Sequence, residues 1–273
     1  MPELPDVEAF KRYMDATALH QQIEGVQVED ERVLRDISVR KLRRGLKGSE
    51  LDHTRRYGKH LLANLGGEDW LVLHFGMTGY LKYFKDEESR PQHARVLLDF
   101  TNGYHLAYVC QRLFGEVGLF SGDLDTFAES EELGADAAEI GWDRFHEIMR
   151  SRRGSIKSAC MNQSIIAGLG NVYTDEILFQ TRIHPKTEVS ELDEKQIRSL
   201  YKTMKEVLDT AVDRWGDPGK LPDSYLLPHR EKGGTCPRGH GKLKTMKVNS
   251  RTTYYCPECQ GEVKKLMSMS SFQ

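Results

Sequence analysis

Between two apolar helical segments the chain reads Gln163-Ser164-Ile165-Ile166-Ala167-Gly168-Leu169-Gly170-Asn171-Val172-Tyr173-Thr174-Asp175-Glu176. Because glycine has no side chain beyond a hydrogen, Gly168 and Gly170 allow the backbone a close approach to a ligand. The free amides at the start of the second helix could then bind a phosphate without the help of a cation. A tight structural turn between two helices is the alternative, and two glycines alone do not exclude it.

Helical patterns extend to both sides of this turn. Residues 142–150 have helical spacing, and residues 193–214 give the clearest helix of the chain. The apolar side chains that share one face of that helix are Ile197, Leu200, Met204, Val207, Leu208 and Ala211. We therefore predict a helical domain over residues 129–228.

A cysteine cluster follows this domain. Cys236-Pro237-Arg238-Gly239-His240 is separated by fifteen residues from Cys256-Pro257-Glu258-Cys259. The intervening residues alternate enough to form a β-hairpin, and two ligand pairs at the ends of a hairpin can close a tetrahedral zinc site. We predict a zinc finger over residues 229–273 with one structural zinc held by Cys236, His240, Cys256 and Cys259. Four unconnected residues are the alternative.

The region before the helical domain has a different pattern. A helical stretch over residues 7–19 precedes short apolar or alternating segments that glycines separate. They lie at residues 23–28, 48–52, 60–65, 70–75, 95–100 and 105–108. Short strands at this spacing are typical of an antiparallel sandwich or barrel. Residues 1–128 are therefore expected to form a β-rich domain, which makes the whole chain an α+β protein of several domains.

Charge is distributed unevenly along the 273 residues. The formal net charge is -2, but from Lys220 onward ten Lys or Arg stand against four Asp or Glu, a local balance of +6. A second basic stretch runs from Arg40 to Lys59, whereas residues 121–147 are acidic. Basic patches at both ends suit a phosphate backbone, although ordinary solvated surfaces explain either patch equally well.

Composition bounds the class of protein. With 38% hydrophobic and 29% charged residues the chain is expected to be soluble and globular. No apolar run approaches the roughly 20 residues of a membrane span, and the start lacks a secretory signal. We expect a cytoplasmic monomer without membrane contact. Cys110 and Cys160 stand alone in apolar settings and are expected to be small buried residues.

The first residues, Met1-Pro2-Glu3-Leu4-Pro5-Asp6, suggest chemistry. A small second residue favours removal of the initiator methionine, which would leave Pro2 with a free secondary amine. Such an amine is a nucleophile toward an aldehyde-like carbon, and the neighbouring carboxyl of Glu3 could transfer protons. A poorly ordered terminus is the alternative.

Several motifs together resemble one family. In family order they are Met1-Pro2-Glu3-Leu4-Pro5, Arg55-Arg56-Tyr57-Gly58-Lys59, His74-Phe75-Gly76-Met77-Thr78-Gly79, Arg112-Leu113-Phe114-Gly115, Ala167-Gly168-Leu169-Gly170-Asn171-Val172-Tyr173 and the cysteine hairpin. Over nearly its whole length the chain resembles the formamidopyrimidine-DNA glycosylases, bifunctional enzymes of base-excision repair. The resemblance implies a β-sandwich, a helix–two-turn–helix domain and a zinc finger that bind duplex DNA containing a damaged base or an abasic site.

The resemblance also assigns roles to residues. It implies that Pro2 attacks the sugar and that Glu3, Lys59 and Arg251 assist, followed by β- and δ-elimination. Met77, Arg112 and Phe114 would fill the space of a nucleotide rotated out of the helix, which suits two apolar wedges and one hydrogen-bonding cation. His93, Lys157 and Asn171 match backbone contacts of the family, and Asp6 matches a position near the lesion pocket. For Met77 and Phe114 ordinary core packing is the alternative, and for His93 and Lys157 an incidental surface position.

Four departures from the family pattern bear on specificity. Asp6 stands where the family usually has Glu, and Val109-Cys110-Gln111 replaces Asn-Asp-Pro before Arg112. His240 replaces a cysteine, and the segment from Gly216 to Cys236 is shorter than the family's lesion-capping loop. The opening residues favour oxidised purines as substrates. A pyrimidine preference like that of the related endonuclease VIII, and a DNA-damage binder without catalysis, are the alternatives.

Overall fold

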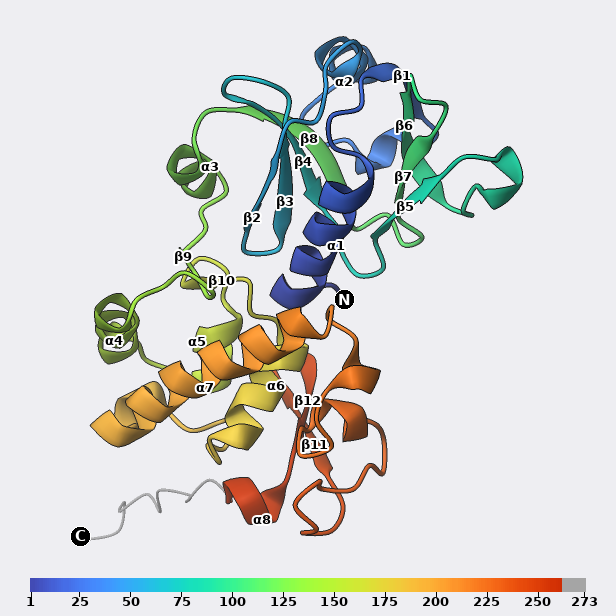
Figure 1. The fold of residues 1–273 in the computed structure, drawn as a ribbon. Coiled ribbons are helices and arrows are strands. Elements are labelled where there is room, and N and C mark those ends of the chain that lie inside the picture. Colours follow the sequence, from blue (N-terminus) through green and yellow to red (C-terminus); the bar gives the residue numbers. More distant parts are fainter. Residues whose placement is uncertain (262–273) are drawn as a thin grey trace, which may run out of the picture.

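Two four-stranded antiparallel sheets form the N-terminal half of the protein (Figure 1). The structure is a computed structural model and describes residues 1–261. One sheet has the strand order β1 (Ile23–Val28), β6 (Ala94–Phe100), β7 (His105–Val109) and β5 (Tyr80–Phe84); the other has the order β2 (Thr54–Tyr57), β3 (His60–Asn64), β4 (Asp69–His74) and β8 (Glu116–Ser121). Apolar side chains from both sheets form one core, so the predicted sandwich is confirmed.

Helix α1 (Leu4–Thr17) connects this sandwich to the rest of the molecule. Val7 and Met14 are buried in the core of the sandwich, whereas Leu4 is buried in the core of the helical region. In Figure 1 the N-terminal end of α1 accordingly points to the boundary between the two regions. The start of the chain is therefore held between two hydrophobic cores.

The helical region follows helix α3 (Leu124–Ser130). It consists of α4 (Trp142–Ser151), α5 (Ile156–Met161), α6 (Asn171–Gln180) and α7 (Glu194–Asp213), with a parallel pair of two-residue strands, β9 (Ala135–Asp136) and β10 (Ile166–Ala167). The apolar face of α7 is buried as its periodicity predicts, through the side chains of Ile197, Leu200, Met204, Val207, Leu208 and Ala211. α7 packs against both α6 and α1.

The C-terminal module is the hairpin of β11 (Lys244–Val248) and β12 (Arg251–Tyr255), followed by the short helix α8 (Pro257–Gln260). It packs on α6 through Phe179, which shares a small apolar cluster with Leu226 and Leu243. The fold class predicted from the sequence is thus confirmed in all three parts. The last residues of the predicted zinc finger, 262–273, lie outside the described residues.

Some local predictions were wrong. Residues 48–52 form no strand and contribute only one bridge, between Gln22 and Glu50. The basic stretch near Arg40 is helix α2 (Val39–Leu46), which buries Leu42 and Leu46 against the sandwich and leaves its basic side chains exposed. The predicted domain boundaries after residues 128 and 228 fall inside α3 and inside the 3₁₀ turn η5 (Leu227–His229), and they stay a prediction. Within residues 1–261, no helix combines the length and the apolar character needed to cross a membrane.

Candidate active site and metal centre

A pocket of about 490 Å³ opens where the sandwich, the helical region and the hairpin meet. It is lined by Met1, Pro2, Lys59, His60, His74, Gly76, Met77, Phe114, Leu133, Met161, Gln163, Gly170, Asn171 and Arg251. Six residues that the sequence singled out separately therefore lie around one cavity: Pro2, Lys59, Met77, Phe114, Asn171 and Arg251. A larger pocket of about 690 Å³ beside Glu8 and Arg56 contains none of the predicted site residues.

The turn before helix α6 holds the side chain of Glu3. Its side chain is fully buried, and its carboxylate accepts the backbone N–H groups of Gly170 at 2.9 Å, Val172 at 2.8 Å and Tyr173 at 3.1 Å. Three of the amides that the sequence suggested for a phosphate are therefore not free, because a carboxylate of the chain itself binds them. An anion is stable at this end of a helix, where N–H groups and the helix dipole converge.

The same turn fixes the backbone next to Pro2. Leu4 donates its N–H to the carbonyl of Gly168 at 3.1 Å. Gly168 has φ +106°, and a Cβ there would lie 2.7 Å from the Leu4 side chain, so both its conformation and its surroundings require glycine. The N-terminus therefore lies at the pocket in a defined position. Met1 precedes Pro2 in this chain and is partly exposed there.

Asp6 is not among the residues that line the pocket. Its Oδ2 accepts the Glu3 N–H at 2.8 Å, which caps the start of α1. Its Oδ1 would lie 2.9 Å from a Cβ at Gly216, the first residue of the segment expected to be shorter than the family's lesion-capping loop. Burial raises the pKa of Asp6 to about 6, and the charge of Glu3 adds to this, whereas the hydrogen bond from Glu3 opposes it.

This pKa predicts a dependence of stability on pH. Because the folded chain binds the Asp6 proton more tightly than the unfolded chain, the contribution of Asp6 is complete below about pH 4 and is lost as pH rises through about 6. Asp6→Asn imitates the protonated form and is expected to raise the free energy of unfolding at pH 7 by up to about 3 kcal/mol, with no gain at about pH 4. Urea unfolding of both proteins between these pH values measures the difference. A gain that does not change with pH would contradict the prediction.

Lys59 reaches the pocket from the turn between β2 and β3. Gly58, with φ +56°, donates its N–H to Asp136 at 2.6 Å, and a Cβ there would lie 3.0 Å from that of Ala167. Asp136 also forms an ion pair with Arg56 at 2.6 Å, and both side chains are almost completely buried. Burial lowers the pKa of Lys59; the charge of Glu3 opposes this and that of Arg251 adds to it. A lysine with a lowered pKa releases a proton more readily.

Two histidines in the pocket were missed by the sequence reasoning. His60 and His74 are direct partners on β3 and β4, and their rings lie 4.9 Å apart. Burial lowers the pKa of His60 to about 3 and that of His74 to about 4, with further effects from neighbouring charges, so both are neutral at pH 7. The signal was that His60 directly follows one recognised motif and His74 begins another, but only strand pairing makes them neighbours.

The wedge candidates lie on two loops that touch. Gly76, with φ +56°, lies so close to the next loop that a Cβ would be 2.4 Å from the backbone of Phe114. Phe114 is 56% exposed, so ordinary core packing does not apply to it. Met77 is partly buried at the same pocket. Arg112 is exposed, and its guanidinium lies 5.2 Å from the centre of the Phe114 ring.

A contact with a phosphate would require Lys157 to lie on the surface, but the residue is buried. Its side chain is fully buried in an ion pair with Asp175, and its Nζ also donates to Oδ1 of Asn171 at 2.8 Å. A buried lysine needs such partners, because the charge is otherwise costly away from water. Asn171 lines the pocket and donates its Nδ2 to the carbonyl of Thr252 at 3.0 Å.

His93 lies apart from the pocket. It precedes β6 with φ +62°, and its carbonyl accepts the N–H of Cys110 at 3.0 Å. The residue is exposed, as a contact to a phosphate backbone requires. Cys110 and Cys160 are buried as expected.

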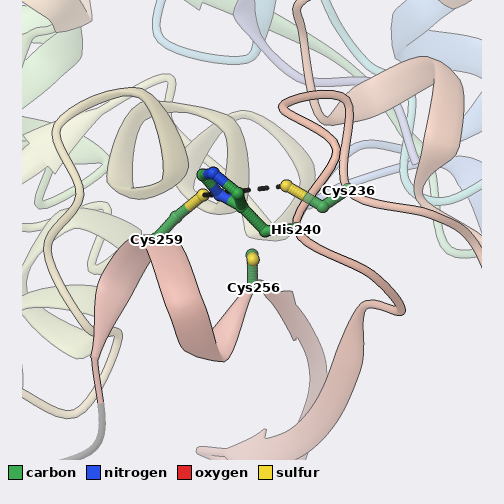
Figure 2. A group of neighbouring side chains, drawn as sticks. All are labelled: Cys236, His240, Cys256 and Cys259. Carbon is green, nitrogen blue, oxygen red and sulfur yellow. Dashed lines mark hydrogen bonds between the residues drawn. The ribbon is translucent and has the colours of Figure 1, made fainter.

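The four predicted metal ligands converge in one cluster (Figure 2). Their donor atoms all lie within 4.8 Å of one another; Cys236 Sγ is 3.7 Å from Cys259 Sγ, and His240 Nδ1 is 3.0 Å from Cys259 Sγ. Sulfurs at the corners of a zinc tetrahedron with bonds of about 2.3 Å are about 3.8 Å apart. Three thiols and an imidazole at these separations fit a zinc ion, and the cluster can hold a metal.

Comparison with known proteins gives one consistent result. The family model of the formamidopyrimidine-DNA glycosylase N-terminal domain matches residues 1–117, and that of the H2TH domain of the same enzymes matches residues 133–219. A formamidopyrimidine-DNA glycosylase of Pelotomaculum thermopropionicum is 32% identical over 95% of this chain and 99% of its own length. One from Synechocystis is 30% identical over 97% of this chain and 100% of its own.

Solved structures agree with the sequence relatives. A complex between the Lactococcus lactis enzyme and DNA containing an abasic site superimposes with a TM-score of 0.86 and 27% identity, over 96% of this chain and 100% of that one. A MutM complex with DNA containing carbocyclic 8-oxo-G gives a TM-score of 0.85 and 28% identity over the same shares.

Proposed function

The chain belongs to the formamidopyrimidine-DNA glycosylase family, and we propose that it is a bifunctional DNA glycosylase and AP lyase of base-excision repair. One observation carries this proposal. Pro2, Lys59 and Arg251 come from three distant parts of the chain and line one pocket, beside the buried carboxylate of Glu3. A DNA-damage binder without catalysis would have no use for a positioned terminal amine and a lysine of lowered pKa at the same cavity.

The proposed reaction begins at Pro2 after removal of Met1. The amine nitrogen bonds to the sugar C1′ while the bond from C1′ to the base breaks, and the base leaves with a proton. Glu3 assists at the ring oxygen as the sugar opens to an iminium ion. The iminium makes the C2′ proton acidic, so its loss expels the 3′ phosphate, and a second elimination expels the 5′ phosphate. Lys59 supplies a proton during elimination, and Arg251 holds the phosphate.

The exposed residues around the pocket are proposed to hold the DNA. Phe114 and Met77 enter the space left by the rotated nucleotide, and Arg112 hydrogen-bonds the base that has lost its partner. His93 and Asn171 contact the backbone. Lys157 is proposed to act on the backbone only indirectly, by orienting Asn171, because its own side chain is buried.

Oxidised purines are the proposed substrates, since the relatives fall in the formamidopyrimidine branch. Asp6 matches a family position near the lesion pocket, and Gly216, which lies close to Asp6, begins the segment expected to be shorter than the family's lesion-capping loop. Excision measured over duplexes containing 8-oxoguanine, formamidopyrimidines and oxidised pyrimidines tests this. Faster removal of pyrimidines would favour the endonuclease VIII-like alternative.

We propose that the metal is one structural zinc per chain, held by Cys236, His240, Cys256 and Cys259. It would fix the hairpin on α6 and take no part in the chemistry. We also propose that the protein acts on DNA as a monomer in the cytoplasm.

The zinc assignment predicts the effect of losing one ligand. His240→Ala is expected to lower zinc content below about half an ion per chain after dialysis against a chelator, and to weaken DNA binding at least about tenfold. Metal analysis and fluorescence titration with an abasic-site duplex measure the two effects. His229→Ala, at a histidine outside the cluster, is the control. Full zinc content in His240→Ala would remove His240 from the ligand set.

A further inference from the structure

A buried ionic cluster joins helix α6 to the edge of strand β12. Lys157 and Asp175, both fully buried, form an ion pair, and Arg230 lies 2.8 Å from the other carboxylate oxygen of Asp175. That second oxygen also accepts the backbone N–H of Tyr254 at 3.0 Å. One carboxylate thus connects three donors from α5, from the linker before the hairpin and from β12 itself.

A second contact reinforces the first. Asn171, one turn before Asp175 on α6, donates to the carbonyl of Thr252 at 3.0 Å, and Arg230 donates to the same carbonyl at 3.3 Å. Thr252 and Tyr254 are two residues apart, so their backbone groups lie on one edge of β12, opposite the edge that pairs with β11. The edge of β12 that does not pair with β11 is therefore held at two points, at the carbonyl of Thr252 and at the N–H of Tyr254.

The register of β12 decides where Arg251 lies. A slip of one residue would move the strand by about 3.3 Å and turn its side chains to the other face. Arg251 immediately precedes Thr252 and lines the pocket. On the same helix, the N-terminal amides hold Glu3. Helix α6 can therefore align the two sides of the reaction centre.

We propose that Asp175 is a positioning residue that sets Arg251 at the pocket through the edge of β12. This inference rests on the proposed function, because it assumes that Arg251 assists the eliminations. A buried ion pair is weak evidence for a role in stability, since well-packed apolar residues can often replace it without loss. The adjacent buried acid, Glu176, offers a contrast: its hydrogen bonds go to Leu226, Leu227 and Gln180 and none is to β12.

The test is a double-mutant cycle on strand cleavage at a preformed abasic site, measured in single turnover. Asp175→Asn is expected to slow cleavage at least about tenfold, as displacement of a catalytic group by an ångström can. In an Arg251→Ala background the same change is expected to slow it less than about twofold, because the group that it positions is gone. Glu176→Gln, the matched control, is expected to change cleavage less than about twofold.

Zinc content and thermal unfolding establish that each variant is folded. If Asp175→Asn does not fold, Arg230→Gln removes the contacts of the guanidinium with Asp175 and with the Thr252 carbonyl, keeps the Lys157–Asp175 pair, and is expected to show the same coupling to Arg251. Equal losses in both backgrounds, or an equal loss in Glu176→Gln, would overturn the role of Asp175. A folded wild-type chain that cleaves no abasic DNA would instead overturn the proposed function.

Discussion

Pro2→Gly is expected to lower borohydride trapping of the chain on a lesion-containing duplex by about 100-fold. An imine formed by a secondary amine is an iminium ion at any pH, so it withdraws electrons without first binding a proton. The glycine imine must be protonated first, and glycine also allows the terminus more conformations. Pro2 lies at the pocket beside Lys59, which is the other amine available there.

The experiment therefore has to identify the nitrogen that reacts. Trapped wild-type protein is digested, and the cross-linked peptide is expected to carry residue 2, after mass spectrometry has established that Met1 is removed. Lys59→Met, with Pro2 intact, is the matched control and is expected to keep trapping detectable while slowing strand cleavage. An adduct on Lys59, or trapping of Pro2→Gly within about threefold of wild type, would contradict the assignment. A processed wild type that is never trapped would contradict the enzyme itself.

Glu3→Gln is expected to slow base excision about 1000-fold, within the range that general acid–base catalysis contributes. The change also removes the charge that the amides of Gly170, Val172 and Tyr173 stabilise, and it turns an amide group toward these donors. Loss of the charge-assisted bonds is expected to lower the free energy of unfolding by about 1–3 kcal/mol. Single-turnover excision well below the unfolding temperature separates the two effects.

Glu3→Asp is the control that keeps the charge and shortens the side chain by one methylene group. Its excision rate is expected between those of wild type and Glu3→Gln, because a carboxylate remains but cannot reach both the helix start and the sugar. Excision by Glu3→Gln within about tenfold of wild type would show that Glu3 only orders the terminus.

Much of the fold could be predicted because its signals are local. The periodicity of α7 depends on the spacing of its own apolar residues, and β1, β3, β4, β6 and β7 depend on short apolar segments between turns. Helix α2 was missed because four basic residues obscure the two leucines that it buries. The strand predicted at residues 48–52 was wrong because these residues pair with the start of β1 through only a single bridge, and local pattern does not show how far such pairing extends.

The candidate site was predicted unevenly for the same reason. The cysteine cluster could be predicted from spacing, since both ligand pairs lie at the ends of one hairpin. Lys157 was expected on the surface because most lysines are exposed. The residues around it do not indicate that Asp175 is its partner. His60 and His74 became neighbours only through strand pairing.

By itself the sequence determined the order of a sandwich, a helical domain and a cysteine hairpin, and the residue types for amine chemistry, wedging and metal binding. Only the tertiary structure decided that Glu3 occupies the amides expected to bind phosphate, that Lys157 is buried, and that one helix connects Glu3 with the strand of Arg251. The physical reason is that hydrogen bonds across about 80 to 170 residues, and the ion pair between Lys157 and Asp175 on two different helices, depend on packed cores that bring these segments together, which local spacing does not encode.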